Sequence, residues 1–246
     1  YSFAVESAPA PQQFGPISFD TVVGPDYPAP GPRQLDTLGA MDTYTFEITA
    51  DMPKPVRLYF DDLTTADHGL RWRVQSPYGW FVFSDDRLDG CDPGARDFWD
   101  NGVYTVAAYW AGDSAPGTYS FVISTIPADA YQTFALNLGD TVPDDTAAGS
   151  GVLETVASRD NYVLTLLADT RVYVEDKTAT WRGQAMILAR RGGGFWMWDN
   201  LDGADPGVQL MPAGTYDLTV FSTCSAEAGA YSLRLWEAPA SQEFAI

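Results

Sequence analysis

The chain has 246 residues, and its 33 acidic side chains against 14 basic ones give a formal net charge of −19 at neutral pH. A surface this acidic repels phosphate backbones, which argues against a nucleic-acid partner, and it attracts divalent cations. No apolar run reaches the roughly 18 to 20 residues that cross a bilayer, so no membrane span is expected. The composition therefore fits a secreted protein better than an intracellular one.

Short strand-like segments follow one another along the chain. They are rich in β-branched and aromatic residues, mostly alternate, and are separated by clusters of Gly, Pro, Asp and Ser. In the first half they cover residues 43–49, 56–60, 70–74, 104–110 and 119–123. Matching segments cover 161–167, 171–174, 185–189, 216–221 and 231–236. No segment has a convincing amphipathic helical period, so the sequence predicts an all-β fold.

The second half of the chain repeats the first. Residues 86–94 return as 199–207 with seven of nine positions identical, and 20–22 align with 140–142. The alignment also equates Tyr44, Tyr104 and Tyr119 with Tyr162, Tyr216 and Tyr231. We therefore predict two tandem antiparallel, jelly-roll-like β-sandwiches at 14–127 and 128–239, with an N-terminal extension at 1–13 and a C-terminal tail at 240–246.

Turn and core motifs in both copies resemble the bacterial pre-peptidase C-terminal domain family. They are Asp-Xaa-Tyr at Asp42 and Asp160, a glycine turn at Gly79 and Gly193, Pro-Ala-Gly-Thr-Tyr at 212–216, and a final Gly-Xaa-Tyr-Ser in each copy. The first copy departs from the pattern, with Trp-Asp-Asn-Gly-Val-Tyr at 99–104. The resemblance implies secreted, non-catalytic sandwiches that belong to larger bacterial extracellular proteins. It carries over no catalytic residue.

Two acidic loops are candidate metal sites. They place aspartates three residues apart around a glycine, as Asp86, Asp89 and Asp92 and as Asp199, Asp202 and Asp205. Calcium takes six to eight oxygen ligands at about 2.3–2.6 Å, and a tight loop can supply carboxylate and carbonyl oxygens. The alternative is that Asp and Gly only form the turn through local hydrogen bonds. The spacing is not that of an EF-hand, and both interpretations stay open.

Aromatic runs at 80–83 and 195–198 precede these loops. Strand alternation predicts one face that carries Phe81 and Phe83, or Phe195 and Met197 in the second copy. The opposite face then carries Trp80, Trp196 and Trp198. If exposed, these tryptophans are ligand-binding candidates, as a flat platform for a polysaccharide ring or another protein. Because aromatic rings are mostly buried, we expect instead that a terminal segment or the other domain covers them.

Catalysis has little support in the sequence. His68 is the only histidine and lies in a turn-like stretch, so a Ser-His-Asp triad would depend on it alone. Zinc-ligand spacing, a phosphate-binding glycine loop and a nucleophile elbow are all missing from the sequence. A hydrolase with paired carboxylates is the weakest alternative. Cys91 and Cys224 occupy non-equivalent positions, so they form either one bridge between domains or two thiols.

The chain ends are a third candidate for function. Residues 1–7 alternate like a strand, and residues 241–246 could be extended. Either end could add a strand to a neighbouring subunit, by which some extracellular fibres assemble. The sequence thus predicts a secreted bacterial, non-catalytic structural or binding module, whose partner is its parent protein or a neighbouring subunit. The alternatives are a filament subunit and a carbohydrate-binding module.

Overall fold

A computed structural model of the chain describes residues 8–27, 34–35, 37, 39–64, 69–88, 92–111, 117–143, 150–179, 183–201, 204–223 and 228–239. The chain divides into two compact units between Ile126 and Pro127. Within the described ranges, the regular structure consists of strands and one short 3₁₀ turn at Ala128–Ala130. The predicted all-β class is therefore confirmed.

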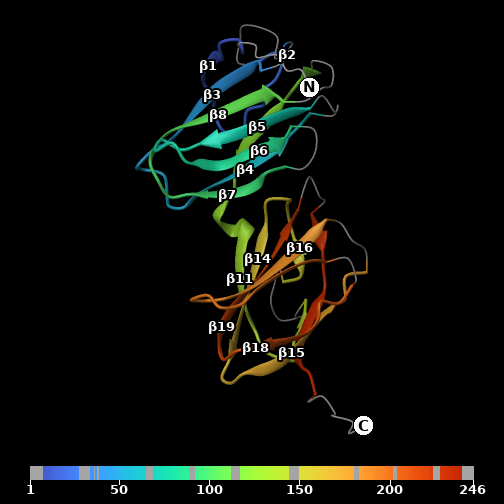
Figure 1. Ribbon diagram of the computed structural model, residues 1–246. Coiled ribbons are helices and arrows are strands. Elements are labelled where there is room, and N and C mark those ends of the chain that lie inside the picture. Colours follow the sequence, from blue (N-terminus) through green and yellow to red (C-terminus); the bar gives the residue numbers. More distant parts are fainter. Residues whose placement is uncertain are drawn as a thin grey trace, which may run out of the picture. The chain divides into compact units, whose positions relative to one another are not determined.

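The first domain is a sandwich of a five-stranded and a three-stranded sheet (Figure 1). The larger sheet has the order β1-β3-β8-β5-β6, with β1 at Gln12–Pro16, β3 at Met41–Ile48, β8 at Gly102–Trp110, β5 at Leu70–Gln75 and β6 at Phe81–Arg87. The smaller sheet has the order β10-β4-β7, with β10 at Phe121–Thr125, β4 at Val56–Asp62 and β7 at Gly94–Phe98. A short ladder pairs β2, Gln34–Leu35, with β9, Gly117–Thr118.

The second domain repeats this arrangement with one more strand, β12, in its smaller sheet. Its five-stranded sheet has the order β11-β14-β19-β16-β17, with β11 at Tyr131–Leu136, β14 at Arg159–Leu166, β19 at Gly214–Ser222, β16 at Gln184–Arg190 and β17 at Trp196–Asn200. Its other sheet has the order β12-β21-β15-β18, with β12 at Thr141–Val142, β21 at Leu233–Glu237, β15 at Thr170–Asp176 and β18 at Gly207–Met211. A short ladder pairs β13, Val152–Leu153, with β20, Gly229–Ala230.

Strand direction is also shared by the two domains. In each five-stranded sheet the first strand runs parallel to its neighbour, β1 with β3 and β11 with β14. The next pairs, β3 with β8 and β14 with β19, are antiparallel. Alternate side chains of the strands point inward and form one apolar core in each domain. The prediction of two tandem sandwiches is confirmed.

Three of the aligned side chains form a buried hydrogen-bonded cluster in the first domain. The hydroxyl oxygens of Tyr44 and Tyr119 lie 2.5 Å apart, and Tyr119 donates to Oδ2 of Asp42 at 2.6 Å. All three residues are buried. Because buried polar groups are costly without partners, this cluster ties β3 to the chain just before β10.

The second domain contains the same cluster. Tyr162 and Tyr231 have their hydroxyl oxygens 2.6 Å apart, and Tyr231 donates to Oδ2 of Asp160. Burial raises the pKa of Asp160 to about 7, although the hydrogen bond from Tyr231 opposes this shift. The predicted equivalence of these tyrosines is confirmed, and their function is to hold the fold together.

The third aligned tyrosine pair anchors the turn before the long central strand. Tyr104 donates to the carbonyl oxygen of Asp100 at 3.1 Å, and Tyr216 donates to that of Pro212 at 2.6 Å. Each hydroxyl thus reaches back four residues from a fully buried ring. The departure of the first copy at 99–104 therefore leaves this contact intact.

One part of the sequence alignment is wrong by one residue. The N–H of Asp20 donates to the carbonyl of Ile123 at 2.9 Å, and the matching bond in the second domain joins Gly139 to Leu235 at 2.7 Å. Asp20 and Gly139 also share a positive φ, 60° and 97°. Asp20 therefore corresponds to Gly139 rather than Asp140. The sequence alignment was shifted by one residue because both copies contain the identical triplet Asp-Thr-Val.

Candidate functional site

The last aspartate of each acidic loop binds to the neighbouring sheet. Asp92 accepts the hydroxyl of Tyr59 at 2.8 Å and the N–H of Asp62 at 2.8 Å, one on each carboxylate oxygen. Burial and the charge of Asp92 raise the pKa of nearby Asp61 to about 6. The loop of the first domain is thus fastened to β4 by a charge-assisted pair of hydrogen bonds.

The second domain has the same fastening. Asp205 accepts the hydroxyl of Tyr173 at 2.7 Å and the N–H of Asp176 at 2.9 Å. Repetition in both copies, with the same donors, indicates a structural role for Asp92 and Asp205. These contacts fit the turn-forming interpretation of the loops, although the bonds reach a neighbouring strand rather than the loop itself.

The other loop aspartates give no metal geometry. Asp86 and Asp199 are half-buried on β6 and β17, opposite Trp72 and Met186. Asp89 and Asp202 lie outside the described residues. Among the residues that are described, no three His, Cys, Asp or Glu side chains are grouped closely enough to hold a metal ion. Calcium binding therefore stays a prediction, which melting with and without a chelator tests.

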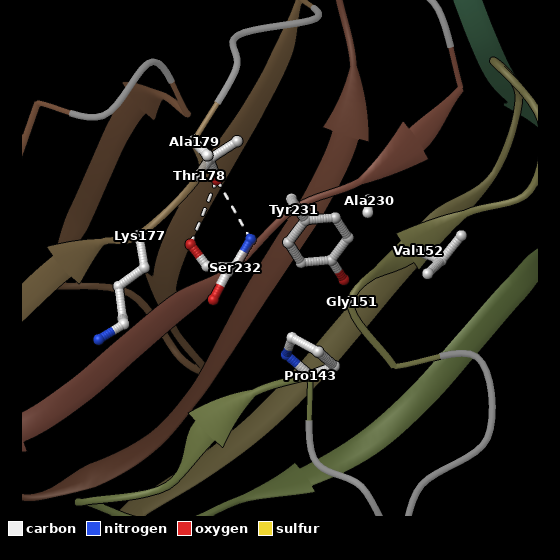
Figure 2. A pocket seen from close by; sticks show the side chains of 9 residues that line it. All are labelled: Pro143, Gly151, Val152, Lys177, Thr178, Ala179, Ala230, Tyr231 and Ser232. Carbon is white, nitrogen blue, oxygen red and sulfur yellow. Dashed lines mark hydrogen bonds between the residues drawn. The ribbon is translucent and has the colours of Figure 1, made fainter.

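A pocket of about 380 Å³ opens at one end of the second domain (Figure 2). Its wall is largely apolar and includes Pro143, Val152 and the ring of Tyr231. Figure 2 shows the two hydrogen bonds between Thr178 and Ser232, in which the threonine hydroxyl donates to the serine carbonyl and accepts from its N–H, both at 3.2 Å.

The polar groups of this pocket belong to the fold. The first domain has the same pair, with Thr64 bonded to the carbonyl and the N–H of Ser120 at 3.2 and 3.1 Å. Lys177 lies 3.8 Å from Glu175, and the Tyr231 hydroxyl turns inward to Asp160. The described lining of the pocket is therefore mainly apolar, and its polar groups are used by the fold.

The aromatic run of the first domain differs from the prediction. Val74 pairs with Phe83 and Gln75 with Phe81, so the register shifts between these pairs. This bulge places Phe83 in the core and leaves Phe81 on the outer face, 47% exposed. The prediction that both rings share one face is wrong, because strand alternation does not include a bulge.

A cation–π sandwich occupies part of the outer face of the first domain. The guanidinium of Arg73 lies 5.4 Å from the ring centre of Phe81 and 5.3 Å from that of Tyr109. Trp80 lies in the turn before β6 and is 47% exposed. Arg73 therefore occupies the area beside Phe81 that a ligand would need.

The second domain presents an exposed tryptophan pair. Trp196 and Trp198 are 66% and 44% exposed on β17, the edge strand of the five-stranded sheet. Phe195 and Met197 pack against the core, as alternation predicts. Their neighbours on β16 are the smaller side chains Ile187 and Ala189. That a terminal segment or the other domain covers these tryptophans stays a prediction, because both terminal segments lie outside the described residues.

A polar row runs along the sheet beside the pair. Across β16, Trp196 and Ala189 are in register with Asp217, and Trp198 and Ile187 with Thr219. Asn161 on β14 follows in the same register as Thr219. We call these three polar residues with Arg191 the polar row, and Trp196 with Trp198 the tryptophan pair.

Hydrogen bonds hold the polar row in place. Arg191 donates Nε to Oδ2 of Asp217 at 2.7 Å and Nη2 to Oδ1 at 2.6 Å. Asn161 donates to the same carboxylate at 3.1 Å and accepts from Thr219 at 3.1 Å. The Arg191 hydrogen bonds lower the pKa of Asp217, with a further contribution from Asn161. The row is therefore an ordered set of donors and acceptors on an open face.

The polar row was absent from the sequence-based candidates. Alternation in 161–167 and 216–221 already places Asn161, Asp217 and Thr219 on the outer face. Which of them lies beside the tryptophan pair depends on the register of β14, β19, β16 and β17. Strand order is not visible in one sequence, so this grouping needed the structure.

Other sequence-based candidates lie outside the described residues. They are His68, Cys91, Cys224 and both terminal segments, 1–7 and 240–246. Strand addition by a terminus therefore stays a prediction. Within the described ranges, the structure contains no helix with the length and hydropathy to span a bilayer.

Comparisons with known proteins give matches of low similarity to solved structures. No family model and no curated protein matches the chain, so the pre-peptidase C-terminal resemblance stays a prediction. The CUB1-EGF-CUB2 domains of rat MASP-1 are 11% identical, with 92% of this chain and 100% of that chain covered and a TM-score of 0.29. The corresponding human MASP-1/3 domains are 9% identical, at 89% and 99% coverage and a TM-score of 0.30. A candidate secreted protein from Eubacterium rectale is 11% identical, at 81% and 69% coverage and a TM-score of 0.23.

Proposed function

We propose that the chain is a secreted, non-catalytic binding module, and that it binds its ligand on the outer face of the second domain's five-stranded sheet. The observation that carries this proposal is the exposed tryptophan pair, which the first domain does not repeat. Features common to both domains are explained by the fold. The exposure of two neighbouring indoles on one sheet face occurs in the second copy alone, so the shared fold does not explain it.

The energetics favour a ligand on this face. An aromatic side chain buries about 150–250 Å² when fully covered. At about 25 cal/mol per Å², the still exposed part of each indole is worth roughly 2–3 kcal/mol to a ligand that covers it. Two adjacent indoles therefore supply roughly 4–6 kcal/mol, which offsets the lower end of the cost of association, about 4 kcal/mol, so further contacts must supply the net affinity.

The chemistry of the other candidate sites supports a non-catalytic module. The carboxylates of Asp92 and Asp205 each accept two hydrogen bonds from the fold. Asp42 and Asp160 are buried in tyrosine clusters. A catalytic acid or base needs a proton-transfer partner in a cleft, whereas these carboxylates accept hydrogen bonds from tyrosine hydroxyls and backbone N–H groups of the fold.

A binding assay with matched variants tests the proposal. The full chain is incubated with a panel of insoluble extracellular polymers that includes polysaccharides and fibrous proteins, and the bound fraction is measured by sedimentation. The W196A/W198A variant should lose binding to the polymer that retains the wild type. The control is W99A, because Trp99 is as exposed as Trp196, at 66%, but lies in the first domain. Equal binding by wild type and W196A/W198A across the panel would refute the proposal.

A further inference from the structure

We infer that the ligand of this face is an uncharged polysaccharide, whose sugar rings lie flat on the tryptophan pair while ring hydroxyls bond to the polar row. This inference rests on the proposed function and names the ligand class for that same surface. It depends on three properties of the face: the alignment of the two indoles, the bonding capacity of the polar row, and the balance of charge.

The two indoles form a short line along an open edge. Residues two apart on a strand are roughly 6.5–7 Å apart and share a face. Trp196 and Trp198 belong to the edge strand β17, whose one partner is β16. A linear polymer can therefore extend past both ends of the pair, whereas a closed pocket would accept only a chain terminus. Sugar rings present flat C–H faces, which pack well on the face of an aromatic ring.

The polar row lies at a suitable distance to reach the edge of such a ring. Asp217 is two strands away from Trp196, or roughly 9–10 Å across the sheet, with Ala189 between them. Ala189 is small, so it leaves space for a ring above the sheet. Hydroxyls at the edge of a sugar stacked on Trp196 therefore point towards Asp217.

The polar row retains bonding capacity of both kinds. Each carboxylate oxygen of Asp217 has two lone pairs, and the guanidinium of Arg191 has five N–H donors, of which two reach Asp217. The amide of Asn161 has a second N–H besides the one given to Asp217. A sugar hydroxyl both donates and accepts, so adjacent hydroxyls match a row where donors and acceptors alternate.

The charge of the face favours an uncharged glycan. Arg191 and Asp217 neutralise each other in a pair with N···O distances of 2.6 and 2.7 Å. The whole chain carries a formal net charge of −19, which repels anionic polymers. A protein partner would favour an apolar centre with a polar rim. Here the polar row lies one strand beyond the aromatic rings, across Ala189 and Ile187, where the hydroxyls of a sugar stacked on the tryptophan pair can reach it.

The first domain does not offer a second copy of this surface. Phe81 holds the position of Trp196, since Phe81 pairs with Gln75 as Trp196 pairs with Ala189. Arg73 stacks on one face of Phe81 from the neighbouring strand, and a phenyl ring at 47% exposure stands where the second domain has an indole at 66%. We therefore expect one glycan site per chain, with a stoichiometry of one in titration.

The test measures the full chain against defined polysaccharides. Affinity electrophoresis and calorimetry use soluble β-glucan, galactomannan and neutral arabinoxylan, and sedimentation uses cellulose and chitin. Alginate and polygalacturonate are the anionic arm, and collagen and elastin are the protein arm. Binding to at least one neutral polysaccharide is expected, with quenched or shifted tryptophan fluorescence.

Two variants separate stacking from hydrogen bonding. W196A/W198A should weaken neutral-glycan binding at least about 30-fold, which corresponds to about 2 kcal/mol. D217N keeps the shape but changes the acceptor row, and it should weaken binding several-fold. W99A should bind as the wild type does. Circular dichroism and melting curves check that each variant is folded. Substitutions at surface positions usually change stability little, so folded variants are expected.

The outcomes distinguish this inference from the proposed function. Neutral-glycan binding that the double variant loses supports both. Tryptophan-dependent binding to collagen, elastin or an anionic polymer, without any neutral glycan, overturns the glycan inference and leaves the proposed function standing. Neutral-glycan binding that W196A/W198A retains in full overturns the inference, because the glycan then lies elsewhere. No binding to any polymer in the panel overturns both.

Discussion

The two domains build the same sandwich around different cores. At six core positions the first domain has the aromatic side chains Phe46, Phe60, Trp72, Phe83, Phe98 and Phe121. The corresponding strand positions of the second domain hold Leu164, Val174, Met186, Met197, Met211 and Leu233. The fold therefore depends on which positions point inward and on the turns between strands, and the identity of the apolar side chain can change.

The outer faces of the two domains differ in another way. In the first domain Arg73 lies between Phe81 and Tyr109 and stacks on both rings. In the second, Ile187 takes the place of Arg73 and leaves Trp196 uncovered. Core changes preserve the fold, whereas these surface changes leave an exposed tryptophan pair in the second copy. The scaffold is thus present twice, and the face that we propose for a ligand belongs to the second domain.

The core comparison predicts the largest effect for a truncation at Trp72. This ring is fully buried and packs on Phe60, Phe83 and Phe121. Trp72→Ala should destabilise the first domain by about 3–5 kcal/mol. Hydrogen exchange resolved by mass spectrometry should locate the loss to residues of the first domain. Unchanged protection there would contradict the core assignment.

A paired substitution sharpens the same comparison. Trp72 lies opposite Ala108, whereas Met186 lies opposite Val220, so a large side chain faces a small one in the first domain. Trp72→Met alone should leave a cavity. Adding Ala108→Val should recover part of the loss, on the order of 1 kcal/mol, because the added methyl groups fill space. If denaturant titrations show that the losses of stability from Trp72→Met and Ala108→Val simply add in the double variant, the two cores are not interchangeable.

The scaffold was predictable from the sequence, whereas the tryptophan pair and the polar row were predictable only in part. Alternation and the repeat located ten strands and the equivalent tyrosines, because both signals are local or depend on a constant offset. The bulge that separates Phe81 from Phe83 leaves no such signal, and the exposure of Trp196 depends on a small neighbour, Ile187, in another strand. Cross-strand register, which also sets the polar row, comes from the fold as a whole.

The shared tyrosine clusters predict equal losses in the two domains. Tyr231→Phe removes the hydroxyl that donates to buried Asp160, and Tyr119→Phe does the same for Asp42. Each should cost about 1–3 kcal/mol, since the acceptor stays buried while the donor is lost. Denaturant melts followed by domain-resolved hydrogen exchange compare the two. A loss in one domain alone would mean that the clusters are equivalent only in appearance.

The pKa of Asp160 predicts how the second domain responds to pH. Because its folded pKa, about 7, lies above the unfolded value of about 3.9, the folded state holds the proton more tightly. This contribution to stability is complete below the unfolded pKa and is lost as the pH rises through about 7. Asp160→Asn should therefore reduce the loss of stability of the second domain between pH 4 and 8, relative to wild type. Parallel pH profiles of the two proteins would rule out this role.

The smallest effect on stability is expected when Arg73 of the first domain and its counterpart Ile187 of the second are each replaced by the other residue type. Arg73→Ile should cost the first domain about 0.5–1 kcal/mol, the value of an exposed cation–π contact. Ile187→Arg should change stability as little, because the side chain stays on the surface. In β16 the new side chain lies between Trp196 and Phe221 on the neighbouring strands. Arg73 has the same position between Phe81 and Tyr109. The introduced guanidinium should therefore stack on the indole and lower ligand binding several-fold. If Ile187→Arg binds ligand as well as wild type does, then covering the tryptophan pair is not what distinguishes the first domain from the second.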